Sequence, residues 1–155
     1  MQDKETGLVL TGVPDLLLGL PRNALAILDL KTARYSNHQD TLLPMYRTQL
    51  VGYSMIAESL CMGDVESIGL VYCEPPECDD DDGLDALVNG AGFSMPFKAT
   101  TVPLELDRSI IPPLLRRAKE IMGMEEAPVG RDGCKECRLV EAMAGKSSIT
   151  NQIYQ

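Results

Sequence analysis

The chain has 155 residues, of which 45% are hydrophobic. This length and composition predict one domain with a buried core. A formal net charge of −9 and a pI near 4.5 argue against binding nucleic acid through a broad basic surface. No apolar run reaches the roughly 18 residues that span a membrane, and residues 1–5 lack signal-peptide features. We therefore expect a cytoplasmic chain without a membrane segment.

Two apolar runs near the N-terminus predict a β-hairpin. The runs cover residues 16–18 and 24–28, and a short loop around Arg22 separates them. The turn of a hairpin fixes the register of its strands. A turn centred near Arg22 places Asp15 opposite Asp29.

The second strand of this hairpin carries charge inside an apolar run. Asp29 follows Ala26-Ile27-Leu28 and precedes Leu30, and a charge in such a strand is costly unless it is compensated. Lys31 projects on the same face because side chains alternate along a strand. Two opposed carboxylates repel each other unless a cation lies between them. Together, Asp15, Asp29 and Lys31 predict a site for Mg²⁺ or Mn²⁺.

A helix and a further strand are predicted to follow the hairpin. The helix runs from near Leu43 to Cys61, and it places Gln49 and Tyr53 on one face because they are four residues apart. Residues 65–72 form a compact strand, parallel to the second strand through a helical crossover. This order of elements predicts an α/β sheet.

The remainder of the chain is predicted to add an edge strand and a second helix. An acidic loop covers residues 79–92, and an extended edge covers residues 93–106. The second helix covers residues 108–122. We expect one domain over residues 1–143 and a polar tail over residues 144–155.

The N-terminal half resembles the PD-(D/E)XK nuclease superfamily. In that family, one strand carries an Asp. The next strand carries an acidic residue, any residue and a Lys at three consecutive positions. Its RecB-like exonuclease branch, which includes CRISPR-associated members, adds a Thr after the Lys and a downstream helix with Gln and Tyr four residues apart. This chain resembles that branch in both features. The residues that carry the resemblance are Gly12, Pro14, Asp15, Asp29, Lys31, Thr32, Gln49 and Tyr53.

The resemblance implies a fold, an activity and a role for each matching residue. The fold is restriction-endonuclease-like, a mixed central sheet flanked by helices, here without the helix that precedes the first strand in some members. The activity is metal-dependent hydrolysis of DNA, with Mg²⁺ or Mn²⁺ held by Asp15, Asp29 and the main-chain carbonyl of Leu30. The roles implied for the other residues are orientation of water by Lys31 and positioning of the site by Gln49 and Tyr53. A larger complex or an oligomer is implied as the source of the missing helix.

Other interpretations stay open beside the nuclease. Taken singly, each of these residues fits an ordinary turn, strand end or half-buried helix face. The runner-up is a catalytically inactive module of the same fold that binds DNA or scaffolds a repair or defence complex. A redox or metal-binding protein built around the cysteines is the third. Basic side chains that could supply local positive potential for DNA are Arg34, Arg47, Arg116, Arg117 and Lys119.

The five cysteines give a weak indication of a metal centre. RecB-like nucleases often hold an iron–sulfur cluster with one upstream and three C-terminal cysteines, whereas only Cys134 and Cys137 lie near this C-terminus. An iron–sulfur or zinc site therefore also needs Cys73 and Cys78. Reduced thiols are the favoured expectation for a cytosolic chain. The single histidine, His38, is assigned no role.

Overall fold

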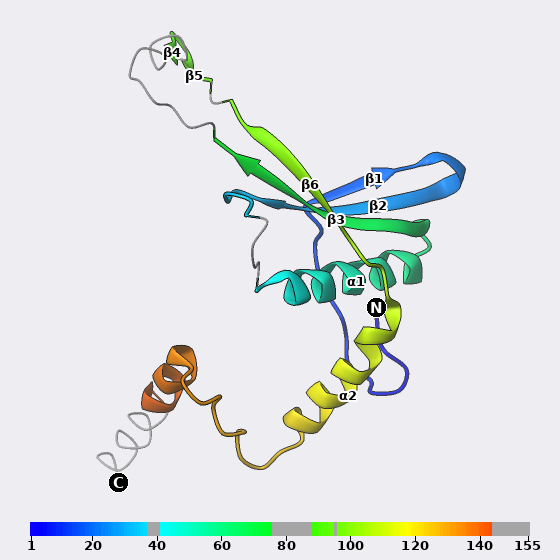
Figure 1. The fold of residues 1–155 in the computed structure, drawn as a ribbon. Helices are drawn as coiled ribbons and strands as arrows, with labels where there is room; N and C mark the ends of the chain where they lie inside the picture. The colour runs from blue at the N-terminus through cyan, green and yellow to red at the C-terminus, as the bar shows by residue number, and fades with distance from the viewer. Residues whose placement is uncertain (37–40, 76–87, 95, 144–155) are drawn as a thin grey trace. The chain divides into compact units, whose positions relative to one another are not determined.

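The computed structural model describes residues 1–36, 41–75, 88–94 and 96–143. It divides into two compact units, Met1–Arg116 and Arg117–Gln155. The elements in chain order are β1 (Leu16–Gly19), β2 (Ala24–Lys31), α1 (Leu43–Ser59), β3 (Asp64–Glu74), β4 (Val88–Asn89), β5 (Gly92–Phe93), β6 (Lys98–Leu104) and α2 (Ile111–Met122) (Figure 1). Short 3₁₀ turns cover Pro21–Asn23 and Arg108–Ile110.

The first unit is built on a mixed four-stranded sheet. Its strand order is β1-β2-β3-β6, and β4 and β5 form a separate two-stranded sheet. Strand β2 pairs antiparallel with β1 and parallel with β3, while β3 pairs antiparallel with β6. Helix α1 connects the two parallel strands, since a parallel pair needs a crossover. The predicted α/β class and the parallel pairing of β2 with β3 are confirmed.

The hairpin has the predicted register. Leu16 pairs with Leu28 and Leu17 with Ile27, so Asp15 and Asp29 are the residues that adjoin the first of these pairs. The turn is closed by the Leu20 N–H, which donates to the Ala24 carbonyl at 2.7 Å. Arg22 and Asn23 take φ values of 61° and 62°, a left-handed conformation that Asn tolerates better than most residues.

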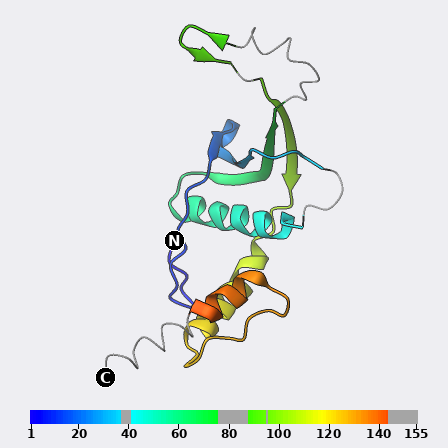
Figure 2. The same cartoon turned by 90° about the vertical axis from the view of Figure 1, so that its left-hand side faces the viewer.

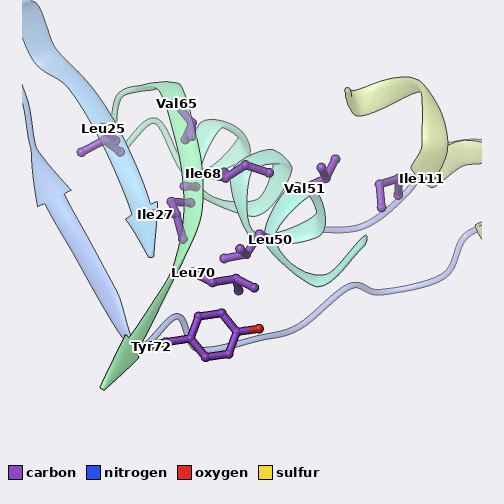
Figure 3. Packing of buried hydrophobic residues seen from close by; sticks show 10 residues of the cluster. Leu25, Ile27, Leu50, Val51, Val65, Ile68, Leu70, Tyr72 and Ile111 are labelled. Carbon is purple, nitrogen blue, oxygen red and sulfur yellow. The ribbon is translucent and has the colours of Figure 1, made fainter. Parts of the chain in front are cut away.

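The core lies between the sheet and α1. Figures 1 and 2 show α1 lying along one face of the sheet. Side chains from that face of β2 and β3 pack with α1, and Tyr72 stands at the end of the β3 row (Figure 3). On the opposite face, Leu18 and Leu30 remain 44% and 41% exposed. The members of the core include Leu25, Ile27, Leu50, Val51, Ala57, Val65, Ile68, Leu70, Tyr72 and Ile111.

Two further predictions compare directly with the structure. The predicted helix over 108–122 is present as a 3₁₀ turn followed by α2. Residues 1–14 contain no helix and are tied by a bridge between Gln2 and Val9. In the second unit, residues 135–143 are helical, which the sequence reasoning did not predict.

Several predictions fall on undescribed parts of the chain. The acidic run 79–82, Cys78, His38 and the tail 144–155 lie outside the described residues. The predicted domain boundary at 143/144 therefore stays a prediction. No helix in the described part of the chain is long and apolar enough to cross a membrane.

An ion pair joins the end of α1 to the segment before α2. Arg108 donates to the Glu58 carboxylate, with Nε at 3.0 Å from Oε2, and to the Val65 carbonyl at 3.0 Å. The Val65 N–H donates to Glu58 Oε1 at 3.1 Å. The Arg108 hydrogen bond lowers the pKa of Glu58 below its ordinary value of 4.5, and the Val65 N–H lowers it further, against the opposing effect of burial.

We expect Glu58→Gln to lower the free energy of unfolding at pH 7 by about 1 kcal/mol, since the pair is partly exposed. A carboxyl group whose pKa is lowered by folding stabilises the protein at a pH above the pKa that it has in the unfolded chain. This contribution is lost as the pH falls through the pKa that it has in the folded protein. The difference between wild type and variant should therefore shrink below about pH 4.5. Urea unfolding across the pH range measures it. Glu66→Gln, at an exposed β3 position, is the matched control and should show no such loss.

Candidate active site

Asp29 is a buried carboxylate at the end of β2, on the face that α1 covers. The residue is only 5% exposed. Its Oδ2 forms an ion pair with the Lys31 ammonium and accepts no hydrogen bond of regular geometry within the described residues. Its Oδ1 accepts from Gln49 Nε2 at 3.4 Å. Burial strengthens both interactions because little water screens them.

Helix α1 supplies the side chains that hold this carboxylate. Gln49 also donates to the Tyr53 hydroxyl at 3.0 Å, so one amide group links the helix tyrosine to the strand aspartate. The predicted spacing of Gln49 and Tyr53 thus places both on the site. Because Leu50 and Val51 are fully buried in the core cluster, α1 is held where its polar face reaches the end of β2.

Asp15 reaches the same strand end from the hairpin. Its exposed side chain accepts a hydrogen bond from the Leu30 N–H at 2.8 Å. The N–H and C=O of one strand residue point to the same side, so the Leu30 carbonyl is directed toward the side that Asp15 occupies. Asp15 therefore contacts the main chain of Leu30, the residue that follows Asp29 in β2.

Lys31 contacts an aromatic ring as well as Asp29. Its ammonium lies 3.9 Å from the centroid of the Tyr46 ring, a cation–π contact that is stronger when it is partly desolvated. Tyr46 was missed by the sequence reasoning. The signal that could have found it is its position three residues before Gln49, which puts it on the same face of α1.

Gly12 allows Tyr53 to take its position. A Cβ at residue 12 would lie 2.1 Å from Cε1 and 2.8 Å from Cδ1 of the Tyr53 ring. The ring also borders a mainly apolar cavity of about 110 Å³, together with Pro14, Leu17 and Ile56. The sequence pattern included Gly12 without a physical role, and the close approach of the ring supplies one.

Most of the predicted basic residues are engaged with carboxylates. Arg47 pairs with Glu105 at 2.6 Å. Arg116 pairs with Glu5 and Arg117 with Glu120, each at 3.0 Å. These contacts reduce the positive potential that they offer to DNA.

The predicted four-cysteine site stays a prediction, because one of its four residues lies outside the described part of the chain. Cys137 donates its N–H to the Cys134 sulfur at 3.5 Å, so these two residues are close. Cys73 belongs to the other unit, and Cys78 lies outside the described residues. The described residues contain no group of three or more His, Cys, Asp or Glu side chains placed to hold a metal ion.

Comparison with known proteins gives no relative. No family model, curated protein or solved structure matches the chain.

We expect Gly12→Ala to displace the Tyr53 ring and to lower the free energy of unfolding by about 1–3 kcal/mol. Gly19→Ala is the matched control, because nothing lies within 4 Å of a Cβ at that position. In a Tyr53→Ala background, Gly12→Ala should become nearly neutral, since the clashing ring is gone. Denaturant unfolding of the single and double variants measures this coupling. Equal losses with and without the ring would contradict the role assigned to Gly12.

Proposed function

We propose that this chain is a nuclease that uses Mg²⁺ or Mn²⁺ to hydrolyse phosphodiester bonds in DNA, with an exonuclease-like preference for strand ends. The observation that carries the proposal is the buried Asp29 carboxylate, whose Oδ2 has the Lys31 ammonium as its charge partner. Buried ionised groups with specific partners are concentrated at functional sites. The second carboxylate, Asp15, lies at the same strand end through its contact with Leu30.

The donor groups at this strand end fit a hard divalent cation. Asp15, Asp29 and the Leu30 carbonyl would hold the ion through oxygen atoms, which Mg²⁺ and Mn²⁺ prefer. Asp29 Oδ2 is available to the ion if the Lys31 ammonium moves aside. A bound ion would supply Lewis-acid activation of the phosphate and of a water.

The surrounding residues have distinct roles in the proposed reaction. The Lys31 ammonium, released from Asp29, orients the attacking water and offsets the negative charge that develops on the phosphoryl oxygens. Gln49 keeps the Asp29 carboxylate oriented through its hydrogen bond, and Tyr53 keeps Gln49 in place. Gly12 and Tyr46 act through Tyr53 and Lys31, so we class them as positioning residues.

One observation favours the inactive, DNA-binding or scaffolding module as a second candidate. The Asp29–Lys31 ion pair already compensates the buried charge, so the fold needs no cation for neutrality. In an inactive module this pair is purely structural. Removing the Lys31 charge separates the two candidates. A metal site would then bind a divalent cation in place of the ammonium, whereas a purely structural ion pair would not.

Metal affinity tests the proposed site. Asp29→Asn keeps the size of the side chain and removes one of the two negative charges, so the Mn²⁺ affinity should fall by about tenfold or more. Lys31→Met removes a competing cation, and we expect equal or tighter Mn²⁺ binding. Calorimetric titration measures both, with thermal unfolding to verify that each variant folds. Glu66→Gln is the control for loss of a carboxylate elsewhere on the sheet. Loss of Mn²⁺ affinity in Lys31→Met would contradict this arrangement.

Cleavage tests the activity itself. Wild-type protein with Mn²⁺ or Mg²⁺ should degrade labelled DNA, and EDTA should abolish the activity. Asp29→Asn and Lys31→Met should both lose turnover. Asp29→Asn should lose it together with its metal affinity, whereas Lys31→Met should lose it although it still binds the metal. Tyr53→Phe should lose only about one hydrogen bond, of the order of 1 kcal/mol. Absence of Mn²⁺ binding and of cleavage on single-stranded DNA, duplex DNA and RNA would leave the scaffolding module as the better interpretation.

A further inference from the structure

A second cavity opens beside the candidate active site, at the carboxyl ends of the parallel strands β2 and β3. Its volume is about 250 Å³, and its lining includes Lys31, Arg34, Tyr35, Tyr46 and Tyr72. The carboxyl ends of parallel strands are the usual place for a ligand in an open α/β sheet. The proposed function assigns a role to Lys31 but leaves the rest of this cavity unexplained.

Aromatic rings dominate the chemistry of the cavity. Three of the five tyrosines in the chain line it. The rings of Tyr35 and Tyr72 lie 5.1 Å apart with an interplanar angle of 45°, and Tyr72 closes one end of the core (Figure 3). The third ring, that of Tyr46, lies under the Lys31 ammonium. Flat rings grouped in this way suit a flat ligand that stacks or packs edge to face.

Positive charge is placed beside these rings. Lys31 lines the cavity and also forms the ion pair with Asp29, so the cavity begins where the candidate active site ends. Arg34 adds a guanidinium group, which binds phosphate oxygens well and stacks on planar groups. A ligand that carries both a flat ring and a phosphate matches both features of the lining. A nucleotide is such a ligand.

We infer that this cavity is a subsite for one unpaired nucleotide of a single DNA strand, with its base against the tyrosine rings and its phosphate at Lys31 and Arg34. The inference rests on the proposed nuclease function and extends it to the substrate. The volume lies just below the range of about 300–1,000 Å³ that is typical of small-ligand pockets, so it suits one base better than a base pair. Lys31 would connect the phosphate of this nucleotide to the reaction site at Asp15 and Asp29.

Binding of a short 5′-phosphorylated single strand, measured by fluorescence anisotropy in EDTA, tests the subsite without any metal chemistry. Tyr35→Leu keeps an apolar side chain and removes the ring, so affinity should fall by about 5- to 100-fold. Tyr35→Phe keeps the ring and should bind within about twofold of wild type. Phe93→Leu removes a ring from an exposed position on β5, outside the cavity, and is the matched control. Arg34→Gln should weaken binding and reduce its salt dependence.

Different outcomes separate the sources of the nucleotide and the two proposals. A blunt duplex should bind more weakly than the single strand, and deoxyadenosine monophosphate should compete only at much higher concentration. Equal affinity for duplex and strand, competition by the mononucleotide at the concentration of the strand, or equal binding by Tyr35→Leu and Tyr35→Phe would each overturn the subsite. If Tyr35→Leu does not fold, the binding of Arg34→Gln decides.

Cleavage with Mn²⁺ but no strand binding in EDTA rejects the subsite alone, whereas strand binding without cleavage rejects the nuclease alone.

Discussion

The ion pair between Asp29 and Lys31 is the interaction on which the arrangement of the first unit depends. Among the described residues, Asp29 is the only charged side chain that is buried, and a buried charge is tolerated only with a partner. Lys31 can serve because it lies two residues away on the same face of β2. The remaining oxygen of Asp29 needs a donor, which Gln49 supplies from α1. This one carboxylate therefore determines which side chain of α1 must face the end of β2, while the burial of Leu50 and Val51 holds the helix there.

The same ion pair connects two features that would otherwise be separate. On one side of Lys31 lie the carboxylates and the Leu30 carbonyl, which suit a divalent cation. The other side holds the tyrosine-lined cavity. The Lys31 ammonium neutralises Asp29 in the structure. A cation bound at Asp29 would release the ammonium toward a phosphate in the cavity. Metal binding would then add a Lys31 contact to the phosphate, beyond the contacts with the tyrosine rings and Arg34, which need no ion.

Electrostatics constrain how an acidic chain of this kind can bind DNA. The net charge is −9, and Arg47, Arg116 and Arg117 are each paired with carboxylates. Long-range attraction of a polyanion is therefore weak, and the affinity of the proposed nuclease for DNA would have to come from short-range contacts such as stacking and cation-mediated contacts to phosphate. This favours an unpaired strand, whose bases are accessible, over a duplex that presents mainly its phosphates.

Local sequence pattern was sufficient to predict β1, β2, α1 and β3 of this unit, but not β4 and β5, since residues 79–92 were predicted to form a loop. The turn around Arg22 set the register that aligns Asp15 with Asp29, since a short hairpin leaves few alternatives, and the four-residue spacing of Gln49 and Tyr53 set their shared face. Only the tertiary structure showed Tyr46 under Lys31, Gly12 against Tyr53, and Tyr35 beside Tyr72. These contacts join segments far apart in the chain, and they depend on how α1 packs on the sheet and how the loop after β2 turns back toward β3. Periodicity reports the face on which a side chain lies, whereas packing decides what that side chain meets.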